Sequence, residues 1–242
     1  MKIDEVRKLH QRKYRELTGR FIVEGEHPVL ELLKAAEKDA RLRESTLYCT
    51  REYANFTDRL PVQVVNPTQM AQICETRTPQ GIVAVAPLLA APPPRPGERA
   101  IYLHGLQDPG NLGTILRTLA WFGDFRCLLG PGSVDVHNGK VVRASMGAIF
   151  HVPVEADVPP ESLPARFRRI ALLDMQGTSI AAAQFRRFDC YVFGSEARGL
   201  PDAPGFGELP RFSITGAAPI ESLNVAMAVA ICQYELHRPA KA

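Results

Sequence analysis

Hydrophobic residues in the first ninety positions occur in short runs and in stretches with helical spacing. A basic helix is predicted over residues 1–20, and Pro28 begins a second helix because the apolar residues after it recur every three or four positions. Short apolar runs rich in β-branched residues predict strands at residues 21–25, 46–49, 62–65 and 82–86. Helices and strands that alternate in this way predict a small α/β domain.

A proline-rich stretch interrupts the pattern at residues 91–99, which read APPPRPGER. Prolines at this density form a semi-rigid spacer of the kind that separates domains. We therefore expect an N-terminal domain over residues 1–90, a linker over residues 91–99 and a second domain over residues 100–242.

The pattern beyond residue 100 again alternates between strands and helices. Strands are predicted at residues 100–106, 126–129, 152–154, 170–174, 190–194 and 212–215, and helices at residues 114–122 and 140–150. Apolar strands that alternate with helices form a largely parallel sheet covered on both faces. Ligands of such sheets bind outside the carboxyl ends of the strands, so the loops after the strands are the expected site of chemistry.

The last long apolar run covers residues 219–236. Every side chain from Val225 to Ile231 is apolar, so the helix predicted here has no polar face along that stretch. It is shorter than the roughly 20 apolar residues that span a bilayer. It is therefore a core helix, or a helix shared between the core and a second subunit. Ser222 and Asn224 precede it and are suited to helix N-capping.

Composition excludes several classes of protein. A hydrophobic content of 45% with 23% charged residues is ordinary for a globular protein. The N-terminus is charged and lacks the apolar core of a signal peptide, so we expect a cytoplasmic protein with no membrane segment. The five cysteines are scattered without a CxxC pair, and the histidines lack metal-ligand spacing. We expect neither a disulfide framework nor a metal site.

Positive charge is concentrated at the N-terminus. The first 20 residues hold seven Lys or Arg and three acidic residues, a net charge of 7 − 3 = +4, whereas the whole chain carries +3. Such a cluster favours phosphate backbones, although a solvated amphipathic helix explains the charge alone equally well.

Three polar loops follow predicted strands. The first, QDPGNLGTILR, contains Asn111 and Arg117; the second, GSEARGL, contains Glu196; the third leads into Ser222 and Asn224. Each residue also has a purely structural explanation. Asn111 is suited to cap a helix, Arg117 to lie on the surface, and Glu196 to offset the dipole of a helix. Neither GxGxxG after the first strand nor a P-loop motif is present, so neither a dinucleotide fold nor a P-loop nucleotide site is supported.

The three loops together resemble a known family. NLGTILRT, FGSEARGL and ESLNVAMA, in this order, are similar to the three motifs of the SpoU (TrmH-like) family of RNA ribose 2′-O-methyltransferases in the SPOUT superfamily. The opening stretch LHQRKYRELTGRFIVEGEHPVLELL resembles that family's N-terminal substrate-binding domain, which is similar to ribosomal protein L30e. The resemblance implies an α/β chain with an L30e-like domain followed by a parallel-sheet αβα SPOUT domain that contains a trefoil knot.

The resemblance also implies a cofactor, partners and site residues. It implies S-adenosyl-L-methionine (AdoMet) as cofactor, structured RNA as substrate, with rRNA favoured over tRNA, and a homodimer whose active site draws on both subunits. The implied catalytic residues are Asn111, Arg117, Glu196, Ser222 and Asn224. The implied cofactor-binding residues are Gly194, Ser195, Glu196, Ile214, Gly216, Ser222, Leu223 and Asn224. Thr215 and Gly216 stand where the family usually has Pro and Met, which loosens this loop because glycine adds backbone freedom.

The implied reaction is an SN2 transfer of a methyl group to a ribose 2′-hydroxyl. We assign Arg117 to the ribose and its neighbouring phosphate, because a guanidinium stays protonated and is poorly suited to act as a base. The alternative is a non-catalytic RNA-binding protein that retains the fold. The sequence does not identify the RNA or the nucleotide.

Overall fold

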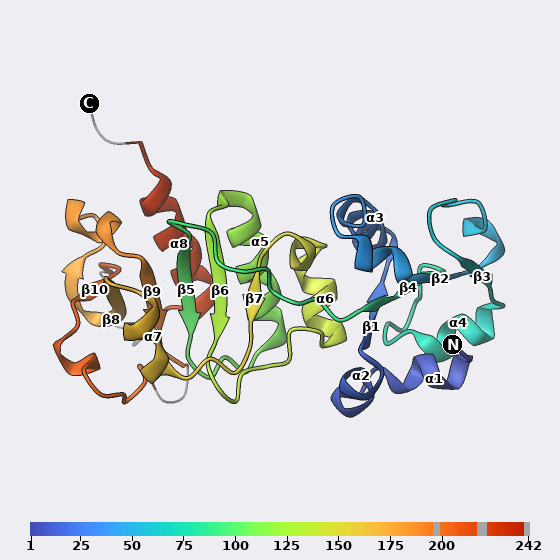
Figure 1. The fold of residues 1–242 in the computed structure, drawn as a ribbon, viewed down its shortest axis with the longest axis horizontal. Coiled ribbons are helices and arrows are strands. Elements are labelled where there is room, and N and C mark those ends of the chain that lie inside the picture. Colours follow the sequence, from blue (N-terminus) through green and yellow to red (C-terminus); the bar gives the residue numbers. More distant parts are fainter. Residues whose placement is uncertain (196–198, 217–221, 240–242) are drawn as a thin grey trace. The chain divides into compact units, whose positions relative to one another are not determined.

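The computed structural model describes residues 1–195, 199–216 and 222–239 (Figure 1). The chain divides into two compact units. The N-terminal unit combines residues 1–89 with residues 135–151, and the C-terminal unit combines residues 90–134 with the chain from residue 152 onward.

The N-terminal unit is built on a four-stranded sheet of order β1-β4-β2-β3. Its strands are β1 Arg20–Glu24, β2 Thr46–Cys49, β3 Val62–Val64 and β4 Ile82–Pro87. β4 is antiparallel to β1 and to β2, while β2 and β3 are parallel. All four predicted strands of this region are confirmed, with ends displaced by at most one residue.

The helices of this unit differ more from expectation. They are α1 Ile3–Lys8, α2 Arg12–Thr18, α3 Glu26–Ala35 and α4 Pro67–Ile73. The single basic helix predicted over residues 1–20 was wrong, because the chain turns after Leu9, which is 1% exposed in the core. Arg15 holds this turn by donating from Nη1 to the carbonyls of Leu9 (2.7 Å) and His10 (2.8 Å).

Helix α4 was not predicted, although the sequence carried its signal. Asn66 Oδ1 accepts from the main-chain N of Gln69 (2.9 Å), and Gln69 Oε1 accepts from the main-chain N of Asn66 (3.0 Å). This reciprocal capping box, with Pro67 at the first helical position, is readable in NPTQ.

Residues 135–151 pack with the N-terminal unit, although they lie within the second domain predicted over residues 100–242. Helix α6, Gly139–Ser145, lies against β1 with Val141 and Val142 fully buried (Figure 1). Arg143 on α6 forms an ion pair with Glu24 at 3.0 Å. Burial of the apolar face of α6 on this sheet explains why the segment joins the N-terminal unit.

The C-terminal unit is built on a six-stranded sheet of order β10-β8-β9-β5-β6-β7. The strands are β5 Arg99–Leu103, β6 Phe125–Leu129, β7 Val154–Glu155, β8 Ile170–Ser179, β9 Cys190–Phe193 and β10 Arg211–Ser213. Every neighbouring pair of strands is parallel. The predicted parallel sheet is confirmed, and the carboxyl ends of its strands lie at one edge.

The helices of this unit are α5 Pro109–Phe122, α7 Leu163–Arg166 and α8 Val225–His237. Helix α5 begins five residues before the predicted start at Thr114. Asp108 caps it by accepting at Oδ1 from the main-chain N of Asn111 (2.7 Å), and Pro109 occupies the first helical position. Asn111 therefore lies in the first turn of α5, and Arg117 lies more than a full turn farther along it.

Helix α8 packs against α5 and is buried on one face only. Val225, Val229 and Cys232 are among its buried residues, whereas Met227, Ile231 and Tyr234 are 49%, 39% and 62% exposed. Within a single chain α8 is therefore not buried on all sides, because one side has no described element packed over it. The alternative, a helix shared with a second subunit, stays a prediction.

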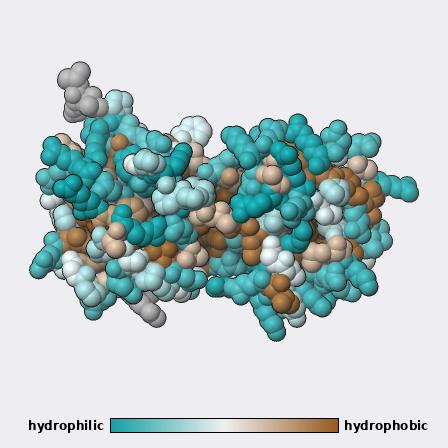
Figure 2. Space-filling view, viewed as in Figure 1, coloured by the Kyte–Doolittle hydropathy of each residue, from teal (hydrophilic) through white to brown (hydrophobic). Residues whose placement is uncertain are grey.

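Short 3₁₀ segments connect these elements at Ala40–Glu44, Arg51–Tyr53, Ala148–Phe150, Pro160–Ser162, Ala183–Arg187 and Phe206–Glu208. The face seen in Figure 2 is largely hydrophilic, and apolar side chains show between the polar ones. Among the described residues, no helix is long and apolar enough to cross a membrane, and no group of His, Cys, Asp and Glu could hold a metal ion. All five cysteines are free thiols.

Candidate active site

The three motif loops follow β5, β9 and β10, so they leave the sheet at the same edge. The loops after β5 and β9 lie side by side, because the main-chain N of His104 donates to the carbonyl of Phe193 (2.9 Å). A Cβ on Gly105 would lie 3.8 Å from the Cβ of Ser195. The expectation that chemistry-bearing loops meet at the carboxyl edge is thus met for these two loops.

Asn111 and Asn224 form the direct link between the first and third motif loops. Asn224 Nδ2 donates to Asn111 Oδ1 at 3.0 Å, across 113 positions of sequence. Asn224 Oδ1 accepts from the main-chain N of Ala226 (2.9 Å) and Met227 (3.3 Å), which caps α8. Because capping fixes the oxygen toward the helix, the amide nitrogen faces Asn111. The Asn224 side chain therefore both caps α8 and links it to the first motif loop.

Arg117 lies on an outward face of α5. It is exposed, and it makes no hydrogen bond or ion pair with any residue that the structure describes. Arg117 follows Asn111 by six positions, which corresponds to about 9 Å along a helix. At this spacing the two side chains lie on different faces of the helix. Trp121, one turn later on the face of Arg117, is 85% exposed. This chain alone does not bring Arg117 together with Asn111.

The second motif loop is tightly closed. The main-chain N of Ser195 donates to the carbonyl of Gly199 (2.8 Å), and the main-chain N of Gly199 donates back to the carbonyl of Ser195 (2.9 Å). A Cβ on Gly194 would lie 2.4 Å from the carbonyl carbon of Gly199, so only glycine fits there. Glu196 lies outside the described residues.

The third motif loop begins after β10 with free main-chain groups. The N–H and C=O groups of residues 214–216 make no hydrogen bond with the described part of the chain. Thr215 and Gly216 are exposed, and a Cβ on Gly216 would meet nothing within 4 Å. Ser222 and Leu223 are also exposed and precede the cap of α8. These main-chain donors and acceptors have no partner within the described chain.

Asp108 was not among the predicted site residues, although its carboxylate sets the start of α5 and so the position of Asn111. The signal was available, because an Asp directly before a Pro is a frequent start of a helix. Cysteine is unsuited to act as a nucleophile here, since burial raises the pKa of the Cys127 and Cys232 thiols to about 12.

Comparison with known proteins agrees with this arrangement. The sequence profile of the SpoU rRNA Methylase family matches residues 98–234, and that of the MRM3-like substrate binding domain matches residues 1–84. The chain is 30% identical to 23S rRNA (guanosine(2553)-2′-O)-methyltransferase RlmP of Bacillus subtilis over 97% of this chain and 95% of the relative.

Solved structures with the same fold cover nearly the whole chain. One is a putative RNA methyltransferase of the TrmH family from Porphyromonas gingivalis, with a TM-score of 0.84 and 34% identity over 98% of this chain and 96% of that one. Another is the AdoMet-bound rRNA methyltransferase from Sinorhizobium meliloti, with a TM-score of 0.81 and 25% identity over 98% and 94%. Three motif loops at one sheet edge, a matching family profile and relatives aligned along their whole length lead to one conclusion: the chain belongs to the SpoU rRNA methylase family.

Proposed function

We propose that this chain transfers the methyl group of AdoMet to a ribose 2′-hydroxyl of ribosomal RNA. The observation that carries the proposal is the Asn111–Asn224 hydrogen bond, which joins the first and third motif loops beside the second. Support comes from the family profile, from the 2′-O-methyltransferase named for the Bacillus relative and from the AdoMet-bound structure from Sinorhizobium.

AdoMet, when bound, supplies an electrophilic methyl group on a sulfonium. Transfer forms a bond from the ribose oxygen to the methyl carbon, breaks the bond from that carbon to sulfur and releases the proton of the hydroxyl. Much of the rate in such a displacement comes from holding the oxygen in line with the leaving group. The joined amides of Asn111 and Asn224 are suited to this orientation, because neighbouring helix starts hold both.

We assign Arg117 to the ribose and its adjacent phosphate, which its planar fork fits. Because Arg117 is exposed and has no partner among the described residues, its guanidinium is available for this role. Ser222 is proposed to orient the ribose, and Glu196 to fix the Asn111 or Arg117 side chain. The proton of the hydroxyl is proposed to leave to a phosphate or to solvent rather than to the guanidinium.

Cofactor binding is assigned to the second and third loops. The main chain of Gly194 and Ser195, with Glu196, is proposed to hold one side of AdoMet. Ile214 and Gly216 are proposed to contact the adenine through their free main-chain groups, and Ser222, Leu223 and Asn224 to close the site. We further propose that the C-terminal chain forms a trefoil knot in this region.

A homodimer completes the proposal. The exposed side chains of Met227, Ile231 and Tyr234 recur at i, i+4 and i+7 and so form one stripe on α8. Trp121 on the adjacent helix α5 adds a large exposed ring. An apolar surface of this kind suits an interface between subunits, and Arg117 on the face of Trp121 would then reach the site of the partner. A cytoplasmic location stays a prediction.

The N-terminal unit is proposed to bind the RNA in the manner of the L30e-like domains it resembles. Lys8 and Lys13 are exposed, and their ammonium groups lie 5.7 and 5.9 Å from the centre of the Tyr14 ring. Two cations beside an aromatic ring suit both phosphate and base contacts.

The direct test incubates the purified chain with AdoMet labelled in its methyl group and with total RNA from cells that lack the gene. Label is expected in rRNA, and its position is expected to resist alkaline cleavage because the 2′-hydroxyl is blocked. Label on a base, or none despite bound AdoMet, would contradict the proposal. The non-catalytic alternative predicts RNA binding without AdoMet binding at millimolar cofactor.

A further inference from the structure

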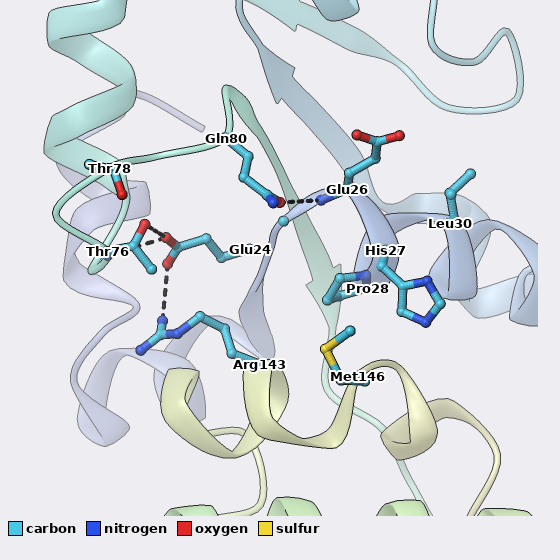
Figure 3. A pocket seen from close by; sticks show the side chains of 11 residues that line it. Glu24, Glu26, His27, Pro28, Leu30, Thr76, Thr78, Gln80, Arg143 and Met146 are labelled. Atoms are coloured by element: carbon cyan, nitrogen blue, oxygen red, sulfur yellow. Dashed lines mark hydrogen bonds and ion pairs between the residues drawn. The ribbon is translucent and has the colours of Figure 1, made fainter.

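The N-terminal unit contains a pocket of about 540 Å³ that the methyl-transfer site does not use. It lies between the end of β1, the start of α3, the loop before β4 and helix α6. In Figure 3, His27, Pro28 and Met146 lie on one side of it and Glu24, Thr76 and Thr78 on the other. Its volume is within the range of about 300–1,000 Å³ that small-molecule sites occupy.

Two charged groups of the lining, Glu24 and Arg143, are already paired. Glu24, 6% exposed, accepts from the main-chain N of Glu75 (3.1 Å) and Thr76 (3.2 Å) and from the Thr76 hydroxyl. Arg143 donates from Nη1 to Glu24 and from Nη2 to Glu75, each at 3.0 Å. One cation shared by two carboxylates leaves a net negative charge, so the pocket interior has no attraction for a phosphate.

Other polar groups of the lining are unpaired. The His27 ring and the Thr78 hydroxyl make no hydrogen bond with any described residue. Gln80 uses Oε1 to accept from the main-chain N of Glu26 (3.0 Å), while its Nε2 has no partner in the described chain. The pocket thus offers neutral donors and acceptors beside the apolar side chains of Leu30, 38% exposed, and Met146, 43% exposed.

Met146 has a backbone conformation that methionine rarely adopts. It ends α6 with φ 49° and ψ 40°, in the left-handed region, where glycine is the usual residue. A side chain in this conformation costs roughly 1–2 kcal/mol, and such strain is typical of ligand sites. The flexible thioether packs well against flat aromatic rings.

We propose that this pocket binds a single unpaired nucleobase of the RNA substrate. The base lies against Met146 and Leu30, with its polar edge toward Thr78 and Gln80 Nε2. Arg77, which is exposed between the two lining threonines and unpaired within the described chain, contacts the adjoining phosphate outside the pocket. That the ligand is RNA rests on the proposed function. RNA-binding proteins read unpaired bases by stacking on flat side chains and by contacts to the base edges. Here the thioether of Met146 takes the place of the flat side chain.

The test observes the Met146 methyl group directly. The full chain is labelled with ¹³C-methyl methionine, which gives one signal for each of its five methionines, and the signal of Met146 is assigned from its absence in Met146→Leu. Single-stranded RNA hexamers of A, of C, of U and of alternating A and G are then added, with an abasic hexamer of equal charge as control. We expect at least one base-containing hexamer to shift the Met146 signal upfield. The abasic hexamer should not shift the Met146 signal, and no hexamer should shift the Met175 signal.

Met146→Gly separates binding from folding. Glycine relieves the left-handed strain, so the melting temperature should hold or rise. Affinity for the responding hexamer should fall about fivefold, as loss of the contact between the thioether and the base implies. Met175→Ala, which removes a methionine that is 66% exposed on β8, should leave that affinity unchanged. An unmoved Met146 signal with every hexamer, equal shifts with the abasic hexamer, or wild-type affinity in Met146→Gly would overturn the proposal. Failure of methyl transfer alone would contradict the proposed function and leave these signals as they are.

Discussion

Arg15 on α2 and Arg117 on α5 are both arginines within helices, but the two regions use them differently. Arg15 is 3% exposed and donates to two carbonyls and to Asp135, where its Nε lies 3.0 Å from Oδ2. Arg117 is exposed and unpaired within the described chain. A buried cation must be paired, whereas an exposed one remains available for a partner.

The same difference occurs within the C-terminal unit. Arg126, near the start of β6, is 2% exposed and forms ion pairs with Glu98 (3.0 Å) and Glu155 (2.6 Å). At the opposite, carboxyl edge of the sheet lie the exposed Asn224 and the unpaired main chain of residues 214–216. Paired charges thus stabilise the fold, and polar groups that can still form hydrogen bonds lie at the motif loops.

The largest expected effect concerns the framework. Arg15→Met should destabilise the N-terminal unit by about 3–5 kcal/mol, because it leaves the Asp135 carboxylate without its buried partner. Hydrogen exchange on residues 1–89 of the full chain measures this loss. Adding Asp135→Asn should restore part of the stability, and Arg7→Met on the exposed face should change it by less than about 0.5 kcal/mol. Unchanged exchange in Arg15→Met would show that the pair does not support the unit.

The corresponding substitution at the candidate active site should lower turnover rather than stability. Arg117→Ala should lower kcat by about 10²-fold or more while the melting temperature and the AdoMet affinity stay close to those of the parent. Arg117→Lys should recover little, since an ammonium cannot make the planar two-point contact.

Turnover and thermal unfolding are measured on one preparation, with the exposed Arg187→Ala as control. Near-normal methylation by folded Arg117→Ala would remove Arg117 from the mechanism, and a large fall in melting temperature would make it a framework residue like Arg15.

A third prediction concerns pH. Burial lowers the pKa of His137 to about 4, and its Nε2 accepts from the main-chain N of Leu89 (3.1 Å). The unfolded chain takes up this proton near pH 6.5 but the folded chain only near pH 4, so stability is lost as pH falls between these values and is fully present above them.

The loss is on the order of 2 kcal/mol and at most about 3. Chemical unfolding from pH 7 to pH 4 measures it. In His137→Gln, which keeps an acceptor but does not titrate, the decline over this range should be shallower. An equally steep decline in the variant would assign the pH dependence to other groups.

The smallest effect is expected at the N-terminal surface. Lys8→Gln with Lys13→Gln should weaken RNA binding similarly for all sequences and reduce the slope of log K against log salt by about 2. These substitutions are preferable to deleting residues 1–90, because deletion would expose the face of α6 that packs on β1. Binding by filter retention from 50 to 300 mM KCl measures the slope, and an unchanged slope would place the phosphate contacts elsewhere.

Local patterning alone determined much of this protein. Short apolar runs were sufficient to predict the parallel sheet and the N-terminal strands, because a strand buried on both faces is a continuous apolar segment that can be recognised locally. The order of the three motif loops predicted the family, and the short polar side chain of Asn224 marked the start of α8. The start of α5 could also have been predicted, since Asp108 and Pro109 form a local capping signal.

The tertiary structure alone decided which polar side chains are paired within the fold and which are exposed. Arg15 meets Asp135 120 positions away, and Asn111 meets Asn224 113 positions away, so no local spacing distinguishes a framework arginine from a free one. The same holds for residues 135–151, whose apolar face packs on β1 rather than with its sequence neighbours. Composition and periodicity fix which face of an element is apolar, but the partner that covers this face is chosen by the long-range packing of the whole chain.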